Sequence, residues 1–386
     1  MSTESGRSGF FHINTRTKSQ TQVPLEMNGD IEDWTLSPDR QTAALSINHG
    51  GASELVLLDV NTHTASHVKG LPIGVIDSLV FNSRSDRLGL VMQTSRSPGE
   101  VWALHVDGEP QRWFTLGEYK GNQKLGPTIE RYATFDSVDG KPRMLDAVVW
   151  SQEATEQQPV VLYLHGGPAA QIRPIYNGAF HEWASEGFAV VAPNVRGSTG
   201  YGLEFTSLDD GVLRINAVRD VGATLDWIAQ DPRFDESRVM LVGPSYGGYL
   251  ALAAAAEYPD RTHSVAASYA IVDLMALAES RPENMRGYTR EEYGDERDPT
   301  VQAELTRISP QQRAAELTMP LLIAHGVDDD RCAVELVDRL VETVRLTNPN
   351  VMYLRFEDEG HGFTGQATLE QYGTAFETML DDLRTR

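Results

Sequence analysis

The stretch LVGPSYGGYL, residues 241–250, places Ser245 between glycines at the end of an apolar run. The run RVMLVG (238–243) is typical of a buried strand, and the alanine-rich segment after the stretch is typical of a helix. A turn this tight crowds the positions two before and two after the serine, so Gly243 and Gly247 leave the room that it needs. The pattern predicts that Ser245 is presented as a nucleophile at a helix amino terminus, which favours developing negative charge.

The sequence around this turn alternates between short apolar runs and helical stretches. This alternation predicts an α/β domain with a mainly parallel, doubly wound sheet that is covered by helices on both faces. Ligands bind at the carboxyl ends of the strands of such a sheet, so functional residues should follow the runs. The expected strands are 160–165, 188–194, 238–243, 264–270, 320–326 and 351–356, and the expected helices are 212–229, 246–257, 333–346 and 367–384.

A serine hydroxyl needs a neighbouring base to become a good nucleophile. In this arrangement the acid and then the histidine follow the serine along the chain. His361 lies in a glycine-flanked loop directly after the run that ends at Phe356. His263 precedes a strand, and His325 precedes the acidic residues that should come before the base. We therefore expect His361 to be the general base for Ser245.

The acid should lie between the serine and the histidine, at the end of a strand. Three adjacent aspartates, residues 328–330, follow the run that ends at Gly326. One buried carboxylate would fix the tautomer of His361 and stabilise its protonated form. The spacing does not choose among the three aspartates.

An oxyanion hole would complete the site. The segment HGGP, residues 165–168, follows another strand-like run, and its glycine amides should face the carboxyl end of the sheet. We expect the amide of Gly167 and the amide of Tyr246, the residue after the serine, to hold the oxyanion.

The first third of the chain has a different sequence pattern, in which short runs of alternating apolar and polar residues are separated by turn residues. A stretch that begins WTLSPD aligns with one that begins VFNSRS, 46 residues further along. A period in the forties made of strands and turns is typical of β-propeller blades. We expect two blade-like repeats, at 34–70 and 80–116, within a β-rich region 1–120, followed by the α/β domain 121–386.

Composition narrows the possible partners and compartments. The net charge of −22 argues against nucleic-acid and anionic-membrane partners, because both require a basic surface. The sequence shows no apolar run of bilayer length and no signal-peptide pattern. The single cysteine, Cys332, excludes an intrachain disulfide and fits a reducing compartment. We expect a cytoplasmic protein in which Cys332 is a packed side chain.

Five motifs, GPSYGGYL, HGGP, NVRGSTGYG, HGVDDDR and EGHGF, together resemble the prolyl oligopeptidase family of serine peptidases, and most of all its acylaminoacyl-peptidase and dipeptidyl-peptidase branches. The resemblance covers about 125–386, and residues 24–116 resemble the last two blades of the family's propeller. It implies an α/β-hydrolase fold. The family pattern His-Gly-x-Asn-Asp-x-Arg falls on residues 325–331 and implies that Asp329 is the catalytic acid.

The resemblance implies a serine hydrolase with a triad of Ser245, Asp329 and His361 that works through an acyl-enzyme, without cofactor or metal. A peptidase or acylaminoacyl peptidase acting on short peptides is the first hypothesis. An esterase, or another acyl hydrolase or acyltransferase acting on a small ester, lactone or amide, is the alternative. A non-catalytic binding or assembly protein is the alternative of a different class.

Three departures from the family pattern concern the substrate and the assembly. Two blades cannot close the tunnel that a propeller of about seven blades forms in the family. The paired glutamates with which the dipeptidyl branch binds a substrate's amino terminus have no convincing counterpart. Met275 and Ala278 stand where proline-selective members have aromatic residues, so we expect these two and Val272 to line an aliphatic pocket. Unpaired blade edges favour a homo-oligomer.

Overall fold

The polypeptide folds into two compact units. The computed structural model describes residues 10–23, 29–121, 126–280 and 283–385. The division expected at residues 120 and 121 is simpler than the observed one, because two later segments join the first unit. The first unit comprises Met1–Thr128, Gln171–Glu182 and Thr199–Thr206, and the second comprises Ile129–Ala170, Trp183–Ser198 and Ser207–Arg386.

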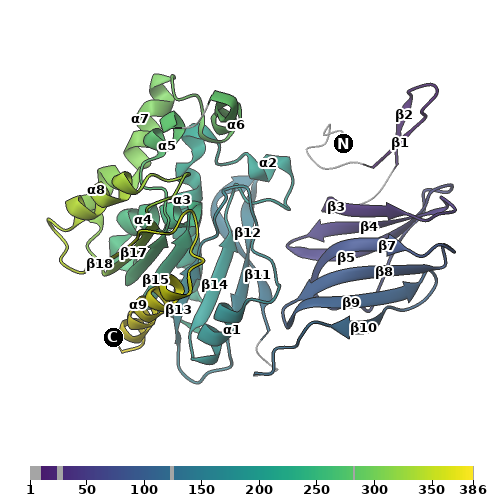
Figure 1. The fold of residues 1–386 in the computed structure, drawn as a ribbon, viewed down its shortest axis with the longest axis horizontal. Helices are drawn as coiled ribbons and strands as arrows, with labels where there is room; N and C mark the ends of the chain where they lie inside the picture. Colours follow the sequence, from purple (N-terminus) through teal and green to yellow (C-terminus); the bar gives the residue numbers. More distant parts are fainter. Residues whose placement is uncertain (1–9, 24–28, 122–125, 281–282, 386) are drawn as a thin grey trace. The chain divides into compact units, whose positions relative to one another are not determined.

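Two four-stranded antiparallel sheets form most of the first unit (Figure 1). Four strands in each sheet agree with the blade-like repeats expected from the sequence. Ala44 and Leu55 of the first sheet share an apolar core with Leu79 and Leu88 of the second. A short hairpin of β1 (Phe11–Ile13) and β2 (Gln20–Gln22) precedes them. The first sheet contains β3 (Asp30–Leu36), β4 (Thr42–His49), β5 (Ala52–Asp59) and β6 (Ala65–His67); the second contains β7 (Gly74–Phe81), β8 (Arg87–Thr94), β9 (Ser97–His105) and β10 (Gln111–Thr115).

Arginine and histidine side chains bind one of the later segments to these sheets. Arg173 donates hydrogen bonds to both carboxylate oxygens of Glu32 at 2.9 Å and to the carbonyl oxygen of Gly51 at 2.8 Å. The Nε2 atom of His181 lies 2.6 Å from the carbonyl oxygen of Ser95. The segment Gln171–Glu182 therefore belongs to the first unit although it follows three strands of the eight-stranded sheet of the second unit.

An eight-stranded mixed sheet forms the second unit, in the order β11-β12-β14-β13-β15-β16-β17-β18. The six strands β13–β18 run parallel to one another, whereas β12 pairs with β14 in the antiparallel sense. This is the α/β-hydrolase arrangement implied by the resemblance. The strands are β11 (Thr128–Val138), β12 (Lys141–Trp150), β13 (Gln158–Tyr163), β14 (Ala189–Asn194), β15 (Phe234–Pro244), β16 (Ser264–Ser268), β17 (Leu321–Gly326) and β18 (Val351–Phe356).

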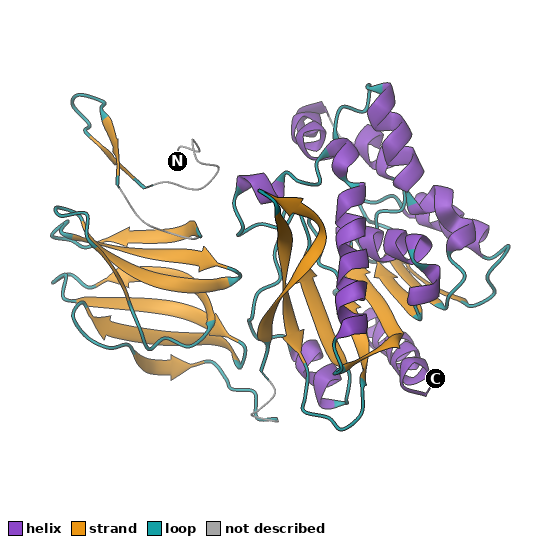
Figure 2. Ribbon diagram, turned by 180° about the vertical axis from the view of Figure 1, so that it is seen from behind, coloured by secondary structure: helices purple, strands orange, loops and turns teal. Residues whose placement is uncertain are grey.

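Helices cover both faces of this sheet (Figure 2). The six expected strands and four expected helices are present with small changes at their ends. Helices α1, α2 and α5–α7 were not expected; α1, α2 and α5 are short, and α6 is rich in polar residues. The α-helices are α1 (Gly178–Ser185), α2 (Leu203–Thr206), α3 (Ile215–Gln230), α4 (Tyr246–Glu257), α5 (Leu274–Ser280), α6 (Glu283–Tyr293), α7 (Pro299–Ile308), α8 (Val334–Val344) and α9 (Gln366–Thr385).

Two local features follow from the residue types. Asp139 and Gly140 have φ values of 51° and 73°, the left-handed conformations that a two-residue hairpin turn requires between β11 and β12. Among the described helices, none is both long enough and apolar enough to cross a bilayer.

A buried ion pair joins the sheet to α3. The Asp220 carboxylate accepts hydrogen bonds from the Arg196 backbone and guanidinium at 2.8–2.9 Å and from the Thr134 hydroxyl at 2.6 Å. The side chains of Arg196 and Asp220 are 3% and 0% exposed. Removing one partner of such a pair leaves an uncompensated buried charge.

We predict that Asp220→Ala lowers the free energy of unfolding by about 3–5 kcal/mol, because it leaves Arg196 buried without its main counter-ion. Urea denaturation measures the change. Asp226→Ala, on the same helix, is the matched control, because Asp226 is 65% exposed and pairs with Arg261 at the surface. The control should cost at most about 1 kcal/mol. Equal losses in the two variants would contradict the prediction.

Candidate active site

Ser245 lies between β15 and α4, in the strand-turn-helix context expected from the sequence. Its φ and ψ angles are 55° and −120°. A non-glycine residue with positive φ is uncommon and costs conformational energy, and such strain concentrates at functional sites. Among the described residues, the side-chain hydrogen-bond partner of the Ser245 hydroxyl is His361.

The glycines around Ser245 are required by backbone contacts. A Cβ atom on Gly243 would lie 2.3 Å from the carbonyl carbon of Gly247. A Cβ atom on Gly247 would lie 2.0 Å from the carbonyl oxygen of Leu164, at the end of β13. Neither distance is possible, so the first turn of α4 can approach the sheet this closely only because these two positions have no Cβ atom.

His361 connects Ser245 to Asp329. Its Nε2 atom lies 2.9 Å from the Ser245 hydroxyl oxygen, and its Nδ1 atom lies 2.8 Å from Oδ2 of Asp329. With the proton on Nδ1, this atom donates to the carboxylate and Nε2 is left to accept from the serine. Asp328 and Asp330 are exposed, whereas Asp329 is buried.

The Asp329 carboxylate accepts hydrogen bonds from His361 and from two backbone amides, and Nε2 of His325, which also faces the carbonyl oxygen of Cys332, lies nearby. His325 lies 3.3 Å from Oδ2, and the amides of Arg331 and Cys332 donate to Oδ1 at 2.8 and 2.9 Å. Burial opposes ionisation, but the hydrogen bonds from His325, His361 and the two amides outweigh it and hold the pKa of Asp329 well below its usual range. Asp329 is therefore present as a carboxylate.

His325 is a residue that the sequence argument set aside. It is fully buried, and its Nε2 atom donates to the carbonyl oxygen of Cys332 at 2.8 Å. It therefore fixes the turn that carries Asp329 and also contacts the carboxylate, as a positioning residue. A histidine that ends a strand four residues before the acid is the signal that could have indicated this role.

Backbone contacts hold the loop of His361 against the loop of Asp329. The amide of Asp328 donates to the carbonyl oxygen of Glu359 at 2.9 Å. A Cβ atom on Gly326 would lie 2.2 Å from that same oxygen, so glycine is needed here. The Glu359 carboxylate accepts from the amides of Thr364 and Gly365 at 2.9 and 2.8 Å and closes the loop.

The predicted oxyanion residues lie in segments next to Ser245. A Cβ atom on Gly166 would lie 3.5 Å from the Cβ of Ser245, so the HGGP segment runs directly beside the elbow. Gly167 follows with a φ of 136°, a conformation that favours glycine. His165 supports the segment, since its Nε2 atom lies 2.9 Å from the Ser198 hydroxyl oxygen. Tyr246 is the first residue of α4.

Comparison with known proteins identifies the family of the chain. The sequence profile of the prolyl oligopeptidase family matches residues 176–380. The chain is 32% identical over 408 residues to dipeptidyl aminopeptidase BIII of Pseudoxanthomonas mexicana, an alignment that covers 92% of this chain. The chain belongs to the prolyl oligopeptidase family.

Other members of the family give a similar picture. The acylamino-acid-releasing enzyme of Sus scrofa is 26% identical over 54% of this chain. The crystal structure of a puromycin hydrolase shares the fold, with a TM-score of 0.84 over 98% of this chain at 22% identity. The chain spans 58% of the length of dipeptidyl aminopeptidase BIII and 58% of the puromycin hydrolase chain.

In this family member a buried polar network holds Tyr246. Its hydroxyl donates to Oδ2 of Asp209 at 2.9 Å and accepts from Arg214 at 3.1 Å. Arg214, which is fully buried, also donates to Asp209 at 2.5 Å and to the Glu292 carboxylate at 2.6 Å. The network joins α6 to the residue after Ser245. No sequence pattern indicated it, because its members lie far apart in the chain.

One of the three residues expected to line an aliphatic pocket, Val272, lines a cavity among the described residues. Val272 lines a cavity of about 30 Å³ with Leu277 and Cys332. Met275 and Ala278 do not line it, and Ala278 is 2% exposed. Val272 therefore lines this small cavity close to the turn that carries Asp329.

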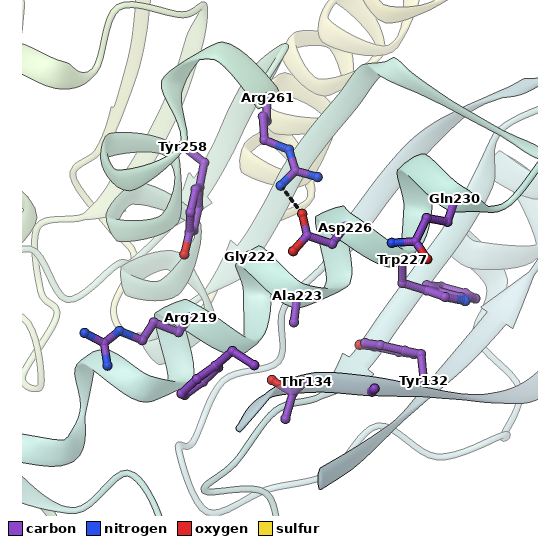
Figure 3. A pocket seen from close by; sticks show the side chains of 12 residues that line it. Tyr132, Thr134, Arg219, Gly222, Ala223, Asp226, Trp227, Gln230, Tyr258 and Arg261 are labelled. Carbon is purple, nitrogen blue, oxygen red and sulfur yellow. Dashed lines mark hydrogen bonds and ion pairs between the residues drawn. The ribbon is translucent and has the colours of Figure 1, made fainter. Parts of the chain in front are cut away.

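Two larger cavities contain none of the triad residues. One, of about 520 Å³, lies between β11 and α3 and is lined by aromatic side chains that include Tyr132, Trp227 and Tyr258 (Figure 3). Its Asp226 and Arg261 side chains pair with each other at 2.6 Å. The groove therefore offers aromatic surface but no nucleophile, and it stands apart from the triad's chemistry.

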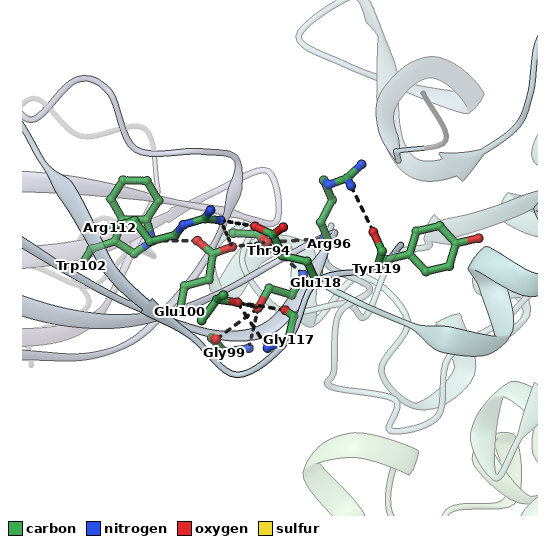
Figure 4. Close-up of polar contacts among 11 residues, drawn as sticks. Thr94, Arg96, Gly99, Glu100, Trp102, Arg112, Gly117, Glu118 and Tyr119 are labelled. Carbon is green, nitrogen blue, oxygen red and sulfur yellow. Dashed lines mark hydrogen bonds and ion pairs between the residues drawn. The ribbon is translucent and has the colours of Figure 1, made fainter. Parts of the chain in front are cut away.

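The other cavity, of about 380 Å³, lies in the first unit. Glu100 there is 3% exposed and accepts a hydrogen bond from the Trp102 indole at 2.8 Å (Figure 4). Arg112 lies 3.5 Å from Glu100 and 2.6 Å from Glu118. Both glutamates are paired with Arg112. They therefore differ from the glutamate pair that binds a substrate's amino terminus in the dipeptidyl branch, because such a pair must be free to accept an amino group.

Two groups of side chains in the described residues have the composition of a cation site. In each, the possible ligand atoms lie within 4.8 Å of one another. One group is Asp329, Cys332 and His361, and the other is Asp209, Asp210 and Glu292.

We predict that Gly247→Ala destabilises the protein by more than about 3 kcal/mol, because the new Cβ would overlap a backbone oxygen that cannot move aside. Gly373→Ala is the matched control, since Gly373 lies in α9 and its Cβ would have no atom within 4 Å. The control should be neutral or stabilising by up to about 1 kcal/mol. Thermal or urea unfolding compares the two. A Gly247→Ala protein of wild-type stability would show that the elbow tolerates a side chain.

Proposed function

We propose that the protein is a serine peptidase that hydrolyses short peptides through an acyl-enzyme, with Ser245, His361 and Asp329 as its triad. The observation that carries this proposal is the chain of hydrogen bonds from Ser245 through His361 to Asp329, at 2.9 and 2.8 Å. Membership of the prolyl oligopeptidase family supports it. The strained backbone of Ser245 supports it further.

The proposed reaction begins when the Ser245 oxygen attacks the substrate carbonyl and its proton passes to Nε2 of His361. Asp329 stabilises the imidazolium that forms. The amides of Tyr246 and Gly167 stabilise the oxyanion, and losing one such donor typically costs about 10²–10³-fold in rate. His361 then gives its proton to the leaving amine. A water molecule, deprotonated by His361, releases the acid and restores Ser245.

The substrate class is a separate part of the proposal. The names of the relatives point to a short peptide, cleaved either after an acylated amino-terminal residue or after a dipeptide. We favour the acylated substrate, because Glu100 and Glu118 share Arg112 and give no open pair for a free amino group. A small ester, lactone or amide is the alternative, and a purely binding role would follow if the serine proved inert.

We predict that Asp329→Asn lowers kcat by about 10⁴-fold, because the amide no longer holds His361 in the productive tautomer. Asp330→Asn is the matched control, since Asp330 is an exposed neighbour in the same turn, and it should retain activity within about twofold. Steady-state hydrolysis of a peptide p-nitroanilide measures both. If both variants lost the same amount of activity, the effect would come from a disturbed turn and not from the Asp329 carboxylate.

We predict that a fluorophosphonate probe labels the wild-type protein and does not label Ser245→Ala, because only an activated serine reacts with it. Protein that has not been treated with the probe is assayed in parallel with acetyl-peptide, free dipeptidyl and p-nitrophenyl ester substrates, with Ser245→Ala as the control. Preference for the acetyl-peptide by kcat/KM supports the proposed substrate class. Preference for the ester supports the alternative, and an unlabelled wild-type protein would contradict the enzyme proposal.

We also propose that the protein is a homo-oligomer in a reducing compartment such as the cytoplasm. The single cysteine supports the compartment. Strand β10 is an edge strand, and Trp113, Phe114 and Leu116 at this edge are 62%, 55% and 72% exposed. Edge strands with exposed apolar residues favour pairing with another chain, and we propose a second copy.

We predict that multi-angle light scattering at micromolar concentration gives a mass of two or more chains, and that Phe114→Lys reduces it, because a charge on the edge opposes pairing. Glu109→Lys introduces the same residue at an exposed position in the loop before β10 without removing an apolar side chain, and it is the control for charge. A single-chain mass for the wild-type protein would contradict the oligomer.

A further inference from the structure

Cys332 lies beside the triad without a place in the proposed reaction. Its amide binds Asp329 and its carbonyl accepts from His325, so its backbone position is fixed. It is the only cysteine of the chain, and its side chain is 7% exposed. We propose that Cys332, Asp329 and His361 together bind a soft divalent cation such as Zn²⁺, which reversibly inhibits the enzyme.

The three side chains have the separation that such a site needs. One ligand atom of each lies within 4.8 Å of the others. Zinc binds sulfur at about 2.3 Å and nitrogen or oxygen at about 2.0–2.2 Å, so its ligand atoms lie roughly 3.3–3.6 Å apart in a tetrahedral site. The 2.8 Å contact between Nδ1 of His361 and Asp329 would open slightly, and the thiol would turn inward. Water would complete the coordination.

The donor set selects the class of cation. A thiolate, an imidazole and a carboxylate suit Zn²⁺ and similar metals, whereas Mg²⁺ and Ca²⁺ prefer oxygen ligands alone. The other acidic group, Asp209 with Asp210 and Glu292, offers no nitrogen or sulfur, and Arg214 already pairs with two of its members. It carries no proposal.

Binding at this site would remove the general base. The Cys332 thiol loses its proton to solvent as the sulfur–metal bond forms. The proton on Nδ1 of His361 moves to Nε2, and the freed lone pair of Nδ1 binds the metal. Nε2 then donates to the oxygen of Ser245 and can no longer accept its proton. No electron is transferred, and a chelator reverses the process. This inhibition rests on the proposed function, whereas the binding does not.

Cobalt(II) tests the binding without reference to activity. Because the chain has one cysteine, any sulfur-to-cobalt charge-transfer absorption must come from Cys332. We expect the tag-free wild-type protein to develop this near-ultraviolet band as one equivalent of Co²⁺ is added, and Zn²⁺ to abolish it by displacement. Cys332→Ser should show no band. A wild-type protein without the band would overturn the proposal.

The rate of fluorophosphonate labelling tests the inhibition. Each protein is compared with its own rate in the presence of a chelator, so that any direct effect of a substitution cancels. We expect micromolar Zn²⁺ to slow labelling of the wild type, and Cys332→Ser to need at least about tenfold more Zn²⁺ for the same effect, because the soft ligand is lost. Equal sensitivity in the two proteins would overturn the role of Cys332.

The two measurements separate the failure of this proposal from the failure of the proposed function. A wild-type protein that is unlabelled without metal but shows the cobalt band would contradict the peptidase and leave the metal site standing. A wild-type protein that is labelled by the probe but lacks the cobalt band would support the peptidase and contradict the metal site. Cys332→Ala is the second variant if Cys332→Ser folds poorly, and circular dichroism checks the fold of both.

Discussion

The site depends first on the close approach of α4 to β13. The first turn of the helix lies against the carbonyl oxygen of Leu164, at a distance that excludes any side chain on Gly247. The backbone turns sharply just before this contact, at Ser245, which has a positive φ angle. The same approach brings the HGGP segment, which begins at His165, beside the serine. One steric constraint therefore positions both the nucleophile and its candidate oxyanion donors.

A second set of interactions, the buried ion pairs and hydrogen bonds of Arg214, supports the residue that follows Ser245. Arg214 is fully buried and touches Asp209, the Tyr246 hydroxyl and Glu292. The charges balance incompletely, with two carboxylates facing one guanidinium. Buried networks of this kind are costly when any member is removed, so they tend to rigidify what they contact. Here the contacted residue, Tyr246, is the direct neighbour of Ser245.

The sequence predicted the parts of the fold and site that have strong local signals. The parallel strands and the nucleophile turn were readable because apolar runs and glycines mark them. Local spacing left three aspartates open, and only the resemblance to a family singled out Asp329. The support from His325 and the Arg214 network was not predicted, because hydrogen bonds between residues distant in the chain leave no periodic pattern. The two later segments that join the first unit were missed for the same reason, since Arg173 binds Glu32 from far along the chain.

The position of the triad along the chain has a consequence for how the protein could diversify. Ser245, Asp329 and His361 and the contacts that orient them all belong to the second unit. The two β-sheets of the first unit contribute no atom to these hydrogen bonds. The triad and the first unit are thus encoded in separate stretches of the polypeptide. Selection could lengthen, shorten or exchange the β-sheets of the first unit while the hydrogen bonds of the triad stayed intact, so one catalytic domain could be combined with different companion domains.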